Sequence, residues 1–167
     1  MAKITLKGQS IDVFGELPKI GSEAPDFVLV DKDLADKTLA DFAGKKKVLN
    51  IVVSLDTSIC ANSAKKFYEE LKKRADVVVL VISADLPFAQ ARICEAENIK
   101  NVTTLSMMRS RHFAKDYGVL QEDGPFAGIC ARAVIVLDQN NKVIYTQLVP
   151  EIAQEPDYDK AITALGK

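Results

Sequence analysis

Two runs of apolar, largely β-branched residues dominate the hydrophobic pattern of the chain, at residues 48–53 and 77–82. Such unbroken apolar runs are typical of strands that are covered on both faces of a sheet. Residues 61–74 lie between them with helical periodicity. The pattern therefore predicts a strand, a helix and a second strand, which makes the two strands a parallel pair.

The helix predicted over residues 61–74 has one apolar face. Ala64, Phe67, Tyr68 and Leu71 follow the i, i+3, i+4, i+7 spacing of a single helix face. Charged residues occupy the remaining faces, at Lys65, Lys66, Glu69, Glu70, Lys72 and Lys73. We expect the two aromatic residues to pack in the core.

A second helix is predicted over residues 86–97. Asp85 can cap it and Pro87 suits its first turn. A short strand near residues 102–105 and a helix near residues 111–117 are expected to follow.

An antiparallel hairpin is predicted near the C-terminal end. Residues 133–137 and 143–148 are apolar runs, and residues 138–142 between them have the composition of a turn. Residues 157–165 are expected to form a closing helix.

The N-terminal part is predicted to contain a smaller hairpin. Residues 4–6 and 11–13 alternate in polarity on either side of a glycine turn. A strand over residues 27–30 and a helical turn over residues 38–42 are expected next.

The combined order of elements predicts an α/β fold. A parallel β-α-β unit followed by an antiparallel hairpin and a closing helix is the layout of the thioredoxin fold. The length of 167 residues suits one domain. We expect a single thioredoxin-like domain over residues 1–167, with residues 1–20 as an N-terminal β-hairpin extension.

Composition and charge exclude several functional classes. Hydrophobic residues make up 48% and charged residues 27% of the chain, which is ordinary globular composition. The formal net charge is only -1, so no basic surface is expected for nucleic acid or for an anionic membrane. No apolar run is long enough to cross a membrane, and the N-terminus is too polar for a signal peptide. We expect a cytoplasmic protein.

The three cysteines are the most informative residues for chemistry. Cys60, Cys94 and Cys130 are too few for a structural disulfide framework, so a disulfide here is expected to be transient and functional. They are also well separated, and the single His112 is near none of them in sequence. We therefore expect no metal site and no cofactor.

Cys60 occupies a position that favours a reactive thiol. It lies where a central strand is followed by a helix, and the unpaired N–H groups and dipole of a helix N-terminus favour a thiolate. Thr57 can direct its hydroxyl group toward the sulfur or a peroxide oxygen, and it can also cap the helix.

Several segments resemble the peroxiredoxins, and among them the bacterial thiol peroxidase subfamily. Residues 54–60 have Thr and Cys at the spacing of its peroxidatic loop. Residues 83–94 are similar to its signature around a resolving cysteine, and residues 131–134 to its strand with a catalytic arginine. Residues 155–158, in the C-terminal tail, extend the similarity, which covers nearly the whole chain.

The resemblance implies a peroxidase with defined site residues. Cys60 would be the peroxidatic residue and Cys94 the resolving residue, joined by a disulfide after each reaction with peroxide. Thr57 and Arg132 would hold the peroxide, and a guanidinium also stabilises the charge that develops as the O–O bond breaks. The resemblance further implies thioredoxin as the reductant and a homodimer.

The chain departs from the subfamily at two positions. Val53 stands where relatives usually have proline, so the loop before Cys60 is expected to be less rigid. Cys130 stands where relatives usually have an apolar residue. If Cys130 and Arg132 share a strand, both side chains point to the same face, which would make Cys130 a second possible resolving residue. Packing as a small hydrophobic residue is the simpler interpretation.

Two other functions are compatible with the same fold or the same pair of cysteines. A disulfide reductase of the same fold would normally have Cys-x-x-Cys at the helix start, and Ala61, Asn62 and Ser63 follow Cys60 instead. A non-catalytic redox sensor or partner-binding module could use the same cysteine pair, and the sequence does not separate it from a peroxidase.

Overall fold

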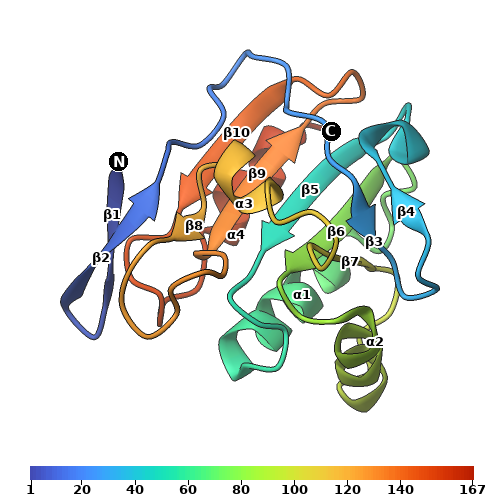
Figure 1. Cartoon of the computed structure of the whole chain (residues 1–167). Coiled ribbons are helices and arrows are strands. Elements are labelled where there is room, and N and C mark those ends of the chain that lie inside the picture. The colour runs from blue at the N-terminus through green and yellow to red at the C-terminus, as the bar shows by residue number, and fades with distance from the viewer.

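The computed structural model describes residues 1–167 and is built on a seven-stranded sheet (Figure 1). The strands lie side by side in the order β10 (Val143–Leu148), β9 (Ala133–Leu137), β5 (Lys46–Ile51), β6 (Val77–Ser83), β7 (Thr103–Ser106), β3 (Leu29–Val30) and β4 (Asp36–Lys37). β5 and β6 are parallel, whereas β9 is antiparallel to both β5 and β10. The predicted β-α-β unit and the C-terminal hairpin are thus confirmed.

Four α-helices and one short 3-10 helix accompany the sheet. They are α1 (Ser58–Leu71), α2 (Pro87–Ala96), α3 (Phe113–Asp116), α4 (Tyr158–Ala164) and η1 (Leu39–Phe42). In Figure 1, α3 lies in front of the sheet and α4 lies behind it. No helix is both long and apolar enough to span a lipid bilayer.

The sheet separates two hydrophobic clusters. The first contains Cys60, the apolar face of α1, residues of α4 and the N-terminal hairpin. Ala64, Phe67 and Leu71 are buried there as expected, whereas Tyr68 is only partly buried. The second cluster lies on the other face, where the rings of Phe113 and Tyr117 stack with centroids 4.6 Å apart.

The N-terminal hairpin forms as predicted, from β1 (Ala2–Leu6) and β2 (Gln9–Phe14). Lys7 and Gly8 make its turn with positive φ angles of 51° and 81°. A short strand, β8 (Leu120–Gln121), pairs with β2 and was not expected from the sequence. It is too short to show a periodic pattern of its own.

Several element boundaries differ from the expectation. The predicted strand over residues 27–30 is reduced to β3, which pairs with the equally short β4. α1 starts at Ser58, because the Thr57 side chain caps it by accepting a hydrogen bond from the Cys60 N–H. Cys60 is therefore inside the first turn of α1.

Candidate active site

Cys60 lies in the first turn of α1, just beyond the carboxyl end of β5, and is fully buried. Its N–H donates to Thr57 Oγ1 at 3.4 Å, and the Thr57 hydroxyl donates to the Ser54 carbonyl at 3.0 Å. The helix cap predicted for Thr57 is confirmed. These two bonds hold the loop that precedes the cysteine.

Arg132 is brought to Cys60 by the pairing of β9 with β5. It precedes β9 directly, and its Nη1 donates to Cys60 Sγ at 3.1 Å. Nε and Nη2 both donate to the Ile152 carbonyl, at 3.1 and 2.9 Å. Arg132 is only 3% exposed and forms no ion pair with a carboxylate. Cys60 Sγ is therefore the one side-chain partner of this buried guanidinium.

The predicted capping role of Asp85 is wrong. Leu86 occupies the N-cap of α2, without a side-chain hydrogen bond. The Asp85 carboxylate instead accepts from Ser54 Oγ, from the Leu55 N–H and from Ser83 Oγ, each at 2.7 Å. Ser54 and Leu55, in the loop before Cys60, come within reach of Asp85 only because β5 and β6 are paired in the sheet. The local sequence around Asp85 therefore showed only the possible cap. Pro87 is in the first turn of α2 as predicted.

Cys94 lies near the C-terminal end of α2 and is partly buried, which raises the pKa of its thiol. Cys60 and Cys94 are both free thiols. A pocket of about 240 Å³ is lined by the start of α1 and the end of α2, including Thr57, Ala61 and Ile93. The structure thus brings the two helix ends together around one opening.

Cys130 lies on the opposite face of the sheet from Cys60. Its Sγ is 3.5 Å from the sulfur of Met107 in the second cluster, and burial raises the pKa of its thiol to about 12, with a smaller contribution from the charge of Asp85. Cys130 and Arg132 do not share a strand, so the condition for both side chains to point to one face is not met. Both precede β9, and the side-chain alternation that holds within a strand is broken there. The simpler interpretation, that Cys130 packs as a small hydrophobic residue, is confirmed.

Val53 is buried in the same cluster as Cys60, so it forms part of the apolar wall around the thiol. Tyr158, at the start of α4, belongs to this side of the sheet as well. Its ring packs edge-on against Phe67, and its hydroxyl donates to Glu155 Oε1 at 3.1 Å. Burial, reinforced by Glu155, raises the pKa of Tyr158. The sequence marked Tyr158 only through the similarity of the C-terminal tail.

A buried thiol in the first turn of a helix, facing an otherwise unpaired guanidinium, defines a thiol-based redox protein on a thioredoxin-like scaffold. The profile of the Redoxin family matches residues 19–162. A thiol peroxidase of Corynebacterium glutamicum is 48% identical over 166 residues, covering 99% of this chain and 100% of that protein.

Solved structures agree with this assignment. A peroxiredoxin-like protein from Aquifex aeolicus is 45% identical, with a TM-score of 0.90 over 96% of this chain and 94% of that chain. A thiol peroxidase from Chromobacterium violaceum is 26% identical, also with a TM-score of 0.90, over 96% and 93% of the two chains. The chain belongs to the redoxin family, within its thiol peroxidase group. The predicted fold class is confirmed, and the chain is a peroxidase of the thiol-dependent class.

Proposed function

We propose that the chain reduces hydrogen peroxide and organic hydroperoxides with Cys60 as the attacking residue. The observation that carries this proposal is the 3.1 Å contact between Arg132 Nη1 and Cys60 Sγ in a buried site without another anion. A guanidinium in such a place favours the thiolate, which is the nucleophilic form of cysteine. The helix N-terminus acts in the same direction.

In the first step the Cys60 thiolate attacks one peroxide oxygen and the O–O bond breaks. The sulfur is oxidised to a sulfenic acid, and the other oxygen leaves as water or an alcohol after taking up a proton. Arg132 stabilises the negative charge that develops on the leaving oxygen. Thr57 Oγ1 already donates to Ser54, so it is best placed to accept a hydrogen bond from the peroxide O–H.

In the second step the Cys94 sulfur attacks the sulfenic acid, forming the Cys60–Cys94 disulfide and releasing water. Both cysteines start inside helices, and Cys60 is fully buried. A disulfide needs Cα atoms within about 7 Å and correctly directed side chains. We infer that the first turn of α1 or the end of α2 unwinds, which also removes the burial that raises the pKa of Cys94.

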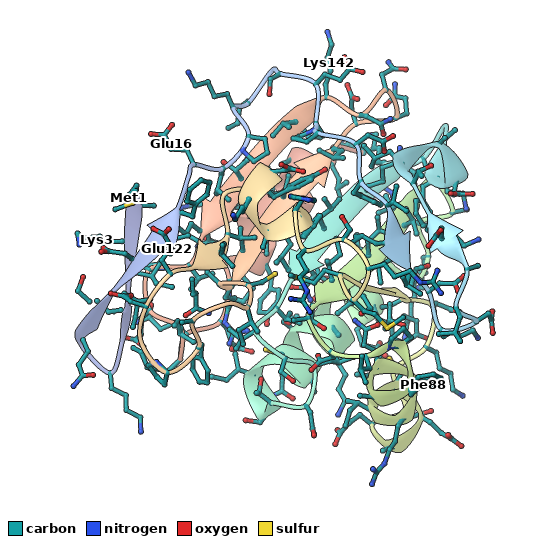
Figure 2. All side chains as sticks on the ribbon, in the orientation of Figure 1. Met1, Lys3, Glu16, Phe88, Glu122 and Lys142 are labelled. Carbon is teal, nitrogen blue, oxygen red and sulfur yellow. The ribbon has the colours of Figure 1, made fainter.

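A dithiol protein then reduces the disulfide by exchange, and we propose thioredoxin for this role in the cytoplasm. No metal or organic cofactor takes part in the proposed cycle. We also propose that the chain acts as one domain and forms a homodimer. Leu86 and Phe88 support the homodimer because they are 52% and 63% exposed, and Phe88 projects away from α2 (Figure 2).

The test is peroxide consumption by the purified protein with thioredoxin, thioredoxin reductase and NADPH. Cys60→Ser is expected to abolish turnover. Cys94→Ser is expected to react once and then accumulate sulfenic and sulfinic acid. Cys130→Ser, the matched control, is expected to turn over normally, and peptide mapping of oxidised wild type should show a Cys60–Cys94 link.

The same measurements separate the peroxidase from the redox sensor. A sensor would form the disulfide with peroxide but would show no sustained turnover with any dithiol reductant. Retention of substantial turnover by Cys60→Ser would reject the assignment of the attacking residue. Sedimentation at micromolar protein concentration tests the homodimer, and a monomer there would remove it.

A further inference from the structure

Arg132 depends on a backbone group for its orientation. The Ile152 carbonyl accepts two of its N–H groups, at 3.1 and 2.9 Å, and the third contact of the guanidinium is Cys60 Sγ. A planar guanidinium held by two bonds at one acceptor has a fixed direction for its remaining N–H groups. The position of the Ile152 carbonyl therefore decides whether Arg132 faces the thiol.

The segment that contains Ile152 is attached to the N-terminal hairpin. The Thr5 N–H donates to the Pro150 carbonyl at 2.8 Å, and the Ile152 N–H donates to the Thr5 carbonyl at 2.9 Å. Thr5 and Glu151 thus form an isolated parallel bridge. The side chain of Ile152 is buried with Ile4 in the cluster that also contains Cys60.

The Glu151 carboxylate accepts four hydrogen bonds, and three of them strengthen this attachment to the hairpin. Thr5 Oγ1 donates to Oε2 at 2.7 Å, and the Lys7 and Gly8 N–H groups of the hairpin turn donate at 3.1 and 3.4 Å. The Ala153 N–H donates from the other side of Ile152 at 3.2 Å. Hydrogen bonding from these donors lowers the pKa of Glu151 to about 2, and the Thr5 hydroxyl makes the largest contribution.

We propose that Glu151 is a positioning residue, and that the N-terminal hairpin acts through Glu151 and the Ile152 carbonyl to hold Arg132 against Cys60. The proposal gives the hairpin a role in the reactivity of a thiol that it does not touch. It deepens the proposed function, because it concerns the residue that activates Cys60. It does not require that Cys94 or thioredoxin completes the cycle.

The test measures the reactivity of Cys60 without using peroxide. In a Cys94→Ser, Cys130→Ser background, Cys60 is the only thiol, and its alkylation by iodoacetamide is followed against pH. Glu151→Ala is expected to slow alkylation at neutral pH about tenfold and to move the pH profile upward, because the guanidinium is no longer directed at the sulfur. The second-order rate with hydrogen peroxide should fall by a similar factor.

Lys3→Ala is the matched control. Lys3 is on the same hairpin, where it pairs with Asp12 at the outer edge (Figure 2), and it forms no hydrogen bond or ion pair with Glu151. Its alkylation profile is expected to match that of the parent protein. Thr5→Val removes the shortest bond to Glu151 and the 3.2 Å bond from the Thr5 hydroxyl to the Pro150 carbonyl, but keeps the other three bonds to the carboxylate. It should give a smaller change in the same direction, which keeps the test valid if Glu151→Ala folds poorly.

The outcomes separate this proposal from the peroxidase assignment. Unchanged alkylation profiles in both Glu151→Ala and Thr5→Val would overturn the positioning role, whatever the peroxidase activity. A loss of rate that follows only the fraction of unfolded protein, with an unchanged pH profile, would also overturn it. If peroxide consumption fails in the parent protein while the alkylation profile shifts as expected, the peroxidase assignment fails and the positioning role stands.

Discussion

Cys60 and Cys130 are equally buried, with no exposed surface on either residue, and yet they lie in very different surroundings. Cys60 Sγ accepts a hydrogen bond from Arg132 in the first turn of α1. Cys130 Sγ faces the thioether of Met107 on the other side of the sheet, where burial raises the pKa of its thiol to about 12.

The comparison shows that burial alone does not determine what a cysteine does. Transfer of a thiol into an apolar environment disfavours the charged form, which is the situation of Cys130. A buried cationic donor reverses this preference, because the thiolate then neutralises a charge that would itself be costly to bury. In the proposed mechanism, one sheet therefore has a reactive thiol on one face and an inert thiol on the other.

The largest expected effect comes from removing the charge that distinguishes the two sites. Arg132→Ala should lower the second-order rate of Cys60 with peroxide by about 10²–10³-fold, the range seen when one donor to a developing anion is removed. The rate of Cys60 alkylation at neutral pH should fall as well, while Cys130 should stay unreactive. Arg132→Lys is the graded control, because an ammonium retains the charge without the planar fork.

A rate within threefold of wild type for Arg132→Ala would break the comparison. It would mean that the helix N-terminus alone separates Cys60 from Cys130. Stopped-flow measurement of the first peroxide reaction, in a Cys94→Ser background, isolates this step from the resolving step.

A smaller effect is expected from Asp85, which holds the loop before Cys60. Asp85→Ala leaves the Leu55 N–H without its acceptor, which should cost about 1–3 kcal/mol in the free energy of unfolding. The peroxide rate should also fall about tenfold, because the loop that places Cys60 loses two of its bonds. Chemical denaturation and single-turnover kinetics measure the two quantities.

Asp31→Ala is a suitable control for Asp85→Ala. The Asp31 carboxylate likewise accepts backbone N–H groups in a loop, from Asp33 and Ala35, but it lies far from the site in the sheet order. It should reduce stability without changing the peroxide rate. Equal loss of rate in both variants would show that Asp85 contributes only to general stability.

Acid should lower the free energy of unfolding by protonating Glu151, whose neighbour Ile152 lies in the cluster on the Cys60 face of the sheet. The pKa of this carboxyl is lowered from 4.5 to about 2 in the folded chain, so its contribution to stability is complete above pH 4.5 and is lost as the pH falls toward 2. The difference in unfolding free energy between wild type and Glu151→Gln should therefore shrink across this interval. A difference that stays constant from neutral pH to pH 2 would contradict the hydrogen bonding of Glu151.

The smallest effect is expected at Cys130. Cys130→Ala should leave peroxidase turnover unchanged and should lower stability by about 1 kcal/mol, because a small buried side chain is shortened. Turnover assays and denaturant titration give both values. A clear loss of turnover would mean that the two faces of the sheet are coupled, which would break the comparison.

The sequence by itself determined the strands, helices and turns that have a regular hydrophobic pattern within a single short segment. The apolar runs of β5 and β6, the periodicity of α1 and the turn between β9 and β10 predicted the fold class. The position of Cys60 at a strand-to-helix junction marked it as the candidate reactive thiol, and the family resemblance supplied its expected partners. These signals are local, because burial on one face or on both faces imposes a regular spacing on neighbouring residues.

Only the tertiary structure decided the contacts between residues far apart in the chain. Asp85 is a residue type that commonly caps helices. Its carboxylate instead accepts a hydrogen bond from Ser54 because β5 and β6 lie side by side. The Ile152 carbonyl that accepts from Arg132 is a backbone group, and every residue has one, so the sequence does not reveal this contact. Cys130 and Arg132 face opposite sides of the sheet because alternation applies only within a regular strand, and β9 begins at Ala133.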